Sequence, residues 1–274
     1  MSVKNLLMLV ALLGIVTVNL LPLVWGIITS LKPSTQIMIY PPRVFSLDLT
    51  LEHYATVLGS DFPISLRNTS VYATATVVLG VFLASLAAFG FDRFRFKGRQ
   101  VLFLVVVASI PLSIGAAALL IPNYLYFTYF GLTNQWFTLV LIYTVYTLPM
   151  AIWIIKGSIE TIPRELDEAA YVDGASSFMV YRLVILPLTK PAMGAAGLML
   201  FMHAWNEFIA GSIMVESPQF RPLQVAIYQF IGFFGRDWGP LTAAATLAII
   251  PVLFVYLVLG SLMVSGLTHG AVKH

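Results

Sequence analysis

The sequence predicts an all-α protein that crosses a membrane several times. Of its 274 residues, 59% are apolar and only 10% are charged, whereas soluble domains carry roughly 25% charged residues. Several charge-free windows are as long as the roughly 20 residues that a spanning helix needs. Because backbone amides inside lipid must form hydrogen bonds within their own segment, we expect each window to be helical. We therefore expect one transmembrane domain over residues 1–274.

Six membrane spans follow from these windows. The first window has no cleavage site close behind it and is too long for a signal-peptide core, so we expect it to remain as a span. A later window, Gln100–Ile155, contains no charged residue, and the polar stretch "GLTNQ" divides it into two spans. The six expected spans are Asn5–Leu31, Asn68–Phe91, Val101–Ile121, Trp136–Ile155, Pro191–Val215 and Pro240–Val264.

The basic residues predict the orientation of these spans. Cytoplasmic loops carry an excess of Lys and Arg, and one side of the six-span arrangement has ten basic residues against five on the other. With the richer side inside, both termini lie in the cytoplasm. This asymmetry also explains the net charge of +3 without a nucleic-acid partner. The inner set is Lys4, Arg93, Arg95, Lys97, Arg99, Lys156, Arg164, Arg182, Lys190 and Lys273, and the outer set is Lys32, Arg43, Arg67, Arg221 and Arg236.

The predicted cytoplasmic loop 156–190 is longer than a connection between two helices requires, and long ordered loops are often functional. Its segment "ELDEAAYVDGASSFMVYRLVILPL" runs from Glu165 to Leu188. Pro163 suits the first turn of a helix, and Gly174 can adopt the left-handed conformation that ends one. Ser176 or Ser177 can cap a second helix, which we expect to end before Pro187. The pattern predicts a short helix–turn–helix outside the membrane.

One face of the first predicted helix has small residues. Leu166, Ala169, Ala170 and Asp173 share this face by their spacing of three and four. Two alanines leave a shallow surface that another protein can approach closely, and Glu168 offers an acceptor to a partner's arginine or amide. We favour a docking element for a soluble protein; the alternative is an amphipathic loop that lies on the lipid headgroups.

The same residues resemble the EAA loop of ABC-importer permeases, whose pattern is E-A-A-x3-G-x9-I-x-L-P. Matching positions are Glu168, Ala169, Ala170, Gly174, Leu186 and Pro187, with Val184 where the family usually has isoleucine. The stretches "IPREL", "AWNEF" and "GLTHGAVK" resemble the second permease of maltose-type carbohydrate importers. The segment "GSLMVSG" at residues 260–266 and the final Lys-His differ from that family's usual tail.

This resemblance implies a type I ABC importer permease fold and a non-catalytic role in a bacterial-type inner membrane. Family members pair with a second permease as a heterodimer, bind two ABC ATPase subunits and receive a sugar or related polyol or glycerol-phosphate compound from an extracytoplasmic solute-binding protein. The chain itself lacks the G-x-x-x-x-G-K-[ST] nucleotide-binding loop, and we expect no cofactor. The implied ATPase-coupling residues are Glu168, Ala169, Ala170, Asp173, Gly174, Leu186 and Pro187.

Polar residues near the outer end of the fifth predicted span are candidates for the solute pathway. They are Trp205, Asn206 and Glu207. A charge within the bilayer is costly and usually faces a bundle interior or water, so Glu207 faces either the pathway and partner permease or the solvated interface. We expect no metal site around His203.

A stand-alone secondary transporter of a small polar solute is the alternative function. Such proteins tend to have inverted repeats and charged residues at the membrane midplane, and neither is evident in this sequence. A membrane enzyme is a weaker candidate, since no paired carboxylates or activated nucleophile occupy a plausible site. The Glu165–Leu188 segment distinguishes these functions, because only the importer permease needs a docked soluble ATPase.

Overall fold

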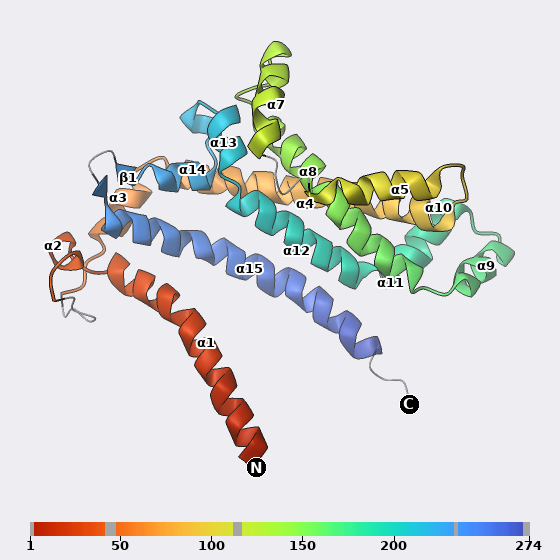
Figure 1. The fold of residues 1–274 in the computed structure, drawn as a ribbon, viewed down its shortest axis with the longest axis horizontal. Helices are drawn as coiled ribbons and strands as arrows, with labels where there is room; N and C mark the ends of the chain where they lie inside the picture. Colours follow the sequence, from red (N-terminus) through yellow and green to blue (C-terminus); the bar gives the residue numbers. More distant parts are fainter. Residues whose placement is uncertain (1–2, 42–47, 112–116, 233–234, 271–274) are drawn as a thin grey trace. The chain divides into compact units, whose positions relative to one another are not determined.

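A computed structural model describes residues 3–41, 48–111, 117–232 and 235–270 of the chain. The described secondary structure is helical apart from one two-stranded hairpin (Figure 1), which confirms the predicted all-α class. The elements are α1 (Val3–Ser30), α2 (Ser34–Ile37), α3 (Glu52–Leu58), α4 (Phe62–Arg93), α5 (Arg99–Ala108), α7 (Ala117–Tyr129), α8 (Trp136–Glu160), α9 (Arg164–Val172), α10 (Ser177–Val180), η1 (Tyr181–Ile185), α11 (Leu186–Leu188), α12 (Lys190–Asn206), α13 (Ile209–Met214), η2 (Pro218–Phe220), α14 (Leu223–Tyr228), β1 (Ile231–Gly232), β2 (Gly235–Arg236) and α15 (Trp238–Gly270).

Four helices of the described chain are long and apolar enough to cross a membrane. They lie within α1, α4, α8 and α15, and all four overlap predicted spans. A fifth candidate is a broken span in which Ser177–Leu188 and Lys190–Asn206 meet at a bend of 76°. The six-span count and the cytoplasmic placement of both termini therefore stay predictions.

The third predicted span, Val101–Ile121, is not one continuous helix. Helix α5 ends at Ala108, and Ser109 caps it while its hydroxyl donates to the carbonyl of Val106 over 2.6 Å. Pro111, two residues after this break, has no amide to donate to a carbonyl of α5. Residues 112–116 lie outside the described part, and α7 begins at Ala117.

The fifth predicted span, Pro191–Val215, is also interrupted. Helix α12 ends at Asn206 because Glu207 adopts an extended backbone with ψ of 124°. Helix α13 then runs from Ile209 to Met214. The prediction of one helix through Val215 is therefore wrong, since the apolar composition that suggested it continues across the break.

The chain divides into two compact units. The first contains Met1–Ile64 and Val225–Ile250. Within it, the buried ring of His53 forms a 2.8 Å hydrogen bond with the carbonyl of Lys32, and the hydroxyls of Ser30 and Tyr54 lie 2.7 Å apart. These contacts attach the end of α1 and the residues after it to helix α3.

The second unit contains Ser65–Gln224 and Pro251–His274. Helix α12 packs along α8, and α4 joins them in one apolar core. Small residues permit close helix approach in membranes: a Cβ added at Gly197 of α12 would lie 3.4 Å from a methyl of Val77 on α4. The buried core includes Ala84, Ala88, Phe89, Ile152, Ile155, Tyr181, Ile185, Ala196 and Leu200.

Candidate functional site

Helix α9 forms the first half of the Glu165–Leu188 segment. Pro163 is its N-cap residue, one position before the first turn that the sequence predicts for it. Glu165 and Asp167 lie in the first turn, where acidic groups complement the positive end of the helix dipole. The amide of Leu166 donates to the carbonyl of Pro163 over 3.3 Å. Local sequence chemistry therefore accounts for where this helix begins.

The turn after α9 confirms the left-handed conformation that the sequence predicts for Gly174. This glycine has φ of +84°, in the left-handed region where a side chain is strained. Its amide donates to the carbonyl of Tyr171 over 3.0 Å, and the amide of Ala175 donates to Ala170 over 2.9 Å. These bonds satisfy carbonyls at the end of the helix and turn the chain sharply.

The second helix starts as predicted but does not end before Pro187. The Ser176 hydroxyl accepts a hydrogen bond from the amide of Met179, so Ser176 is the cap. The helix continues through the π-helical stretch η1 into α11, which contains Pro187. A proline ring crowds the carbonyl four residues earlier, and the wider π turn immediately before α11 accommodates it. The helix ends instead at Thr189.

Most of the predicted coupling residues are accessible. Glu168, Ala169, Asp173, Gly174 and Pro187 are exposed, whereas Ala170 and Leu186 are half-buried. Two large apolar neighbours are also open to solvent: Val172 is 86% exposed and Phe178 is 65% exposed. The segment thus presents small, acidic and apolar side chains together on its accessible surface.

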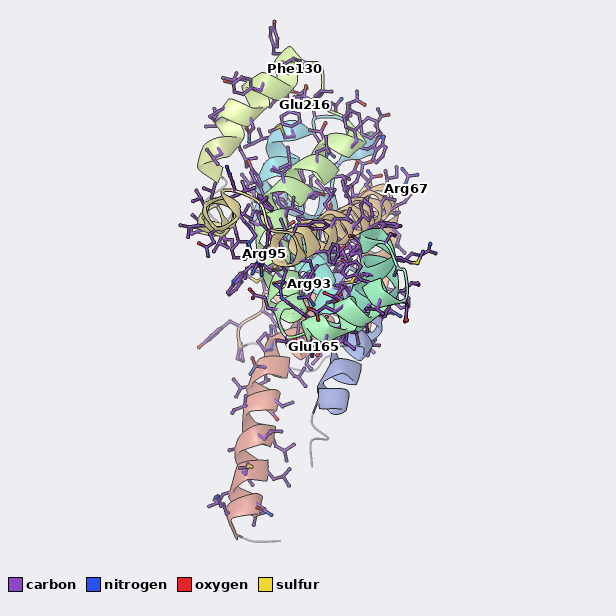
Figure 2. All side chains as sticks on the ribbon, turned by 90° about the vertical axis from the view of Figure 1, so that its right-hand side faces the viewer. Arg67, Arg93, Arg95, Phe130, Glu165 and Glu216 are labelled. Atoms are coloured by element: carbon purple, nitrogen blue, oxygen red, sulfur yellow. The ribbon has the colours of Figure 1, made fainter. Side chains whose placement is uncertain are left out.

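Asp167 differs from its neighbours in the segment in its burial and its ion pair. Asp167 is buried, and its carboxylate lies 2.5 Å from Nε of Arg93 at the end of α4. Arg93 also pairs with Asp92 and donates to the carbonyl of Ile162. Figure 2 shows the labels of Arg93, Arg95 and Glu165 near one another in that view. The sequence assigns Arg93 only to membrane orientation, so this contact was missed.

The sequence contains one indication that Arg93 needs a buried acidic partner. Asp92 and Arg93 directly follow the apolar run of the second predicted span, where a desolvated charge needs a partner. Asp167 alone of the three acids at the start of α9 occupies the face that turns toward the core, as Ala170 does one turn later. The sequence does not tell which basic residue meets it.

The structure places the predicted pathway residues at the break between α12 and α13. Trp205 is buried and stacks on Phe201 with ring centroids 5.2 Å apart, while Asn206 is exposed. The carboxylate of Glu207 accepts hydrogen bonds from the amides of Ala210 at 2.7 Å and Gly211 at 3.1 Å. Glu207 therefore caps the start of α13, and its contribution to the pathway stays a prediction.

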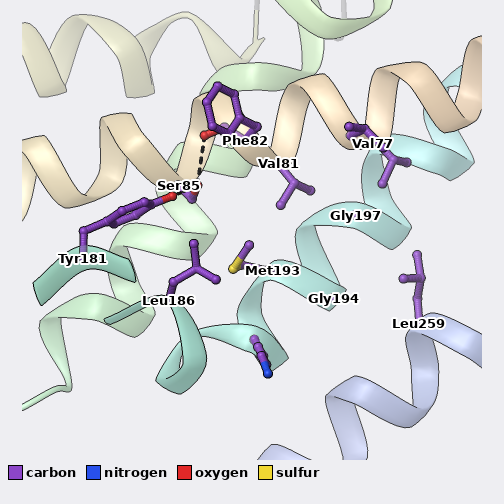
Figure 3. Close-up of a pocket in the computed structure, with 12 residues that line it drawn as sticks. Val77, Val81, Phe82, Ser85, Tyr181, Leu186, Met193, Gly194, Gly197 and Leu259 are labelled. Carbon is purple, nitrogen blue, oxygen red and sulfur yellow. Dashed lines mark hydrogen bonds between the residues drawn. The ribbon is translucent and has the colours of Figure 1, made fainter. Parts of the chain in front are cut away.

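A cavity of about 520 Å³ lies between α4, η1, α12 and the second half of α15 (Figure 3). Its walls are mostly apolar, and the polar side chains that line it belong to Ser85, Tyr181 and Lys190. Figure 3 shows the hydroxyls of Ser85 and Tyr181 pointing toward one another, 2.7 Å apart. The Ser85 hydroxyl donates to the carbonyl of Phe82 over 2.9 Å, so it accepts from the Tyr181 hydroxyl and both hydroxyl protons are engaged.

Comparisons with known proteins agree on one family. Residues 76–269 match the family described as binding-protein-dependent transport system inner membrane component. The chain is 32% identical over 276 positions to the trehalose/maltose transport system permease protein MalG of Thermococcus litoralis, covering 98% of this chain and 97% of that protein. It is 32% identical over 265 positions to the sulfoquinovosyl glycerol transport system permease protein SmoH of Agrobacterium fabrum, covering 95% and 91%.

A solved structure shares the fold. It is a bacterial ABC transporter involved in the import of the acidic polysaccharide alginate, with a TM-score of 0.80 and 22% sequence identity. The match covers 95% of this chain and 98% of that one. The described helices thus have the arrangement of an ABC-importer permease.

Proposed function

Since the chain belongs to the binding-protein-dependent transport system inner membrane component family, we propose that it forms half of the pathway of an ATP-driven sugar importer. The family is one of multi-pass inner-membrane transport proteins, and its members are permeases rather than enzymes. Two related permeases are named for the transport of trehalose and maltose and of sulfoquinovosyl glycerol. These names support a sugar or a sugar derivative as the solute here.

The observation that carries the proposal is the open surface of the Glu165–Leu188 segment. Residues 156–190 couple the permease to an ABC ATPase through this surface. Val172 is 86% exposed beside the exposed carboxylates of Glu168 and Asp173, a mixture of apolar and acidic groups that suits a protein partner better than a lipid surface. A cleft in a soluble partner can cover the apolar side chain and pair the carboxylates with basic groups.

A second permease supplies the other half of the pathway. The apolar window of α1, within Lys4–Ser30, has no buried residue in this chain. Its leucines and valines must therefore meet lipid or another protein. The importer is completed by two ATPase subunits and by a solute-binding protein that delivers the sugar from outside.

Gentle purification of the tagged chain, followed by mass spectrometry, tests this assignment. We expect a second permease and an ABC ATPase to be recovered with it. Ala169→Arg is the matched variant, because Ala169 is exposed on α9 and a long cation there obstructs close docking. That variant should retain the second permease and lose the ATPase.

The opposite results are equally clear. If the chain is recovered alone while a known importer, purified in parallel, retains its subunits, a stand-alone transporter is favoured. If both permeases and ATPase are recovered, a co-purified or co-encoded binding protein can be screened against sugars and polyols by thermal shift. A binding protein that responds only to non-carbohydrate solutes would contradict the proposed substrate class.

A further inference from the structure

Arg93 is enclosed between two acidic side chains from different helices. Its side chain is 7% exposed and that of Asp167 is 8% exposed. One nitrogen, Nη1, lies 2.5 Å from the carboxylate of Asp92, and Nε lies 2.5 Å from that of Asp167. Nη2 donates to the carbonyl of Ile162 over 3.0 Å. Nη1 and Nη2 thus have hydrogen-bond partners, whereas Nε meets Asp167 as an ion pair without hydrogen-bond geometry. Ile162 lies just before α9 and Asp167 lies in its first turn.

The other nearby cations do not replace Arg93. Arg164 donates to the carbonyl of Asp92 over 3.1 Å, and its side chain is half exposed. Arg99 also reaches that carbonyl, at 3.4 Å. In the part of the chain that the structure describes, Arg93 is the cation within ion-pair distance of Asp167. Arg93 is therefore the buried cation that ties α4 to Asp167, while the half-exposed Arg164 makes a second contact from α9 to Asp92 on α4.

A second contact attaches α4 to the other half of the Glu165–Leu188 segment. The buried hydroxyls of Ser85 and Tyr181 lie 2.7 Å apart, as Figure 3 shows. The Phe89 ring also packs on the Tyr181 ring, with centroids 5.2 Å apart. Ser85 precedes Arg93 by about two helical turns, or roughly 12 Å along the axis. Both helices of the segment are thus attached to α4, at two separated points.

We propose that Arg93 and Asp167 form a rigid joint through which α9 moves the cytoplasmic end of α4. The proposal rests on the proposed function, in which an ATPase moves α9. One attachment at Tyr181 would let α9 pivot about the Gly174 turn, whereas a second attachment at Asp167 prevents that rotation. The guanidinium has three nitrogens and reaches Asp92, Asp167 and the carbonyl of Ile162 at once, whereas a lysine ammonium has a single nitrogen. Arg93 and Asp167 are therefore positioning residues for transport.

Because Arg93 and Asp167 are buried, a substitution that removes the charge of one of them should have a large effect. Removing one partner of a buried ion pair leaves an uncompensated charge and is strongly destabilising. Arg93→Met takes the buried cation away from Asp167, while the Asp92 carboxylate keeps the more distant Arg164 at 3.9 Å. Asp167→Asn is milder, because Arg93 keeps its contact with Asp92. If the contact acts as a joint, transport per ATP hydrolysed should fall further in Arg93→Met than in Asp167→Asn. The loss in the double variant should be smaller than the sum of the two single losses.

Spin labels can measure the joint directly in the purified importer. The chain has no native cysteine, so labels at Glu165→Cys on α9 and Leu83→Cys on α4 report one distance; both side chains are exposed. We expect a single narrow distance distribution in the parent protein and a broadened one in Arg93→Met. Arg93→Lys should be intermediate. Arg95→Met is the matched control, because Arg95 lies in the same stretch and is exposed.

Transport per ATP hydrolysed is the second measurement. Arg93→Met should lower it by roughly ten-fold, within the usual range of coupling between sites, while the ATPase subunits still co-purify. A distribution in Arg93→Met as narrow as that in Arg95→Met, with unchanged transport per ATP, would overturn the joint. If Arg93→Met does not assemble, Asp167→Asn decides by the same two measurements. Absence of any ATPase from the parent complex would refute the proposed function, and the label distances would still test the joint.

Discussion

Replacing Gly174 tests how far ATPase coupling depends on the turn after α9. Its φ of +84° lies in the left-handed region, and a Cβ built there meets no atom within 4 Å. Gly174→Ala therefore introduces backbone strain without a steric clash. That strain is about 1–2 kcal/mol for an ordinary residue. A cost of this size shifts a two-state equilibrium by roughly 5–30-fold away from the formed turn.

The identity of the substituent should rank the variants. Asparagine tolerates the left-handed conformation better than alanine does, so Gly174→Asn should be the mildest change. Proline fixes φ near −65° and has no amide, so Gly174→Pro also loses the 3.0 Å hydrogen bond to Tyr171. Coupling of ATP hydrolysis to uptake should be highest in Gly174→Asn, lower in Gly174→Ala and lowest in Gly174→Pro. All three variants should still insert into the membrane.

Gly157→Ala is the control for this series. A Cβ at Gly157 also meets nothing within 4 Å, but this glycine lies inside α8 without a positive φ. Alanine there should be neutral or stabilising by up to about 1 kcal/mol. The assay is ATP hydrolysis stimulated by the binding protein, with uptake into proteoliposomes. Normal uptake by Gly174→Pro, or equal activity of Gly174→Ala and Gly157→Ala, would refute the role of the turn.

Three further substitutions test separate contacts. Ser176→Ala removes the acceptor for the amide of Met179 and should lower the stability of this helix start by about 0.5–2 kcal/mol. Amide hydrogen exchange in α10 should become faster in Ser176→Ala, whereas Ser176→Asp should keep the amides protected. Glu207→Ala removes the cap of α13 and should lower the unfolding temperature in detergent, because a similar free energy of stabilisation is lost. Glu207→Gln should have an intermediate unfolding temperature. An unchanged unfolding temperature in Glu207→Ala would exclude capping. Gly197→Leu should separate α12 from Val77 and cost about 1–3 kcal/mol, more than Gly197→Ala does in the same melting assay.

Local features of the Glu165–Leu188 segment could be predicted because local chemistry determines them. The left-handed turn at Gly174 and the cap at Ser176 each depend on residues within one turn of helix. The end of the second helix could not be predicted in the same way. Pro187 usually stops a helix, but the π turn before it accommodates the ring within a helix that ends at Thr189.

The burial of Asp167 shows the limit of sequence reasoning. Glu168 and Asp167 are adjacent and chemically alike, yet one is exposed and the other buried. The difference comes from Arg93, which is far away along the chain and adjacent only in the fold. Likewise, hydropathy predicts the apolar composition of Pro191–Val215 correctly but not the extended backbone at Glu207 that divides it.

Photo-cross-linking from α9 in native membranes tests the central proposal most directly. A benzophenone amino acid at Ala169, exposed on α9, should form an adduct with an ABC ATPase. The same group at Tyr40, which is 96% exposed in the predicted outer loop, should not capture that subunit. An ATPase adduct from Ala169 alone would support coupling through this segment. Adducts with lipid only, under conditions in which a known importer gives its ATPase adduct, would contradict it.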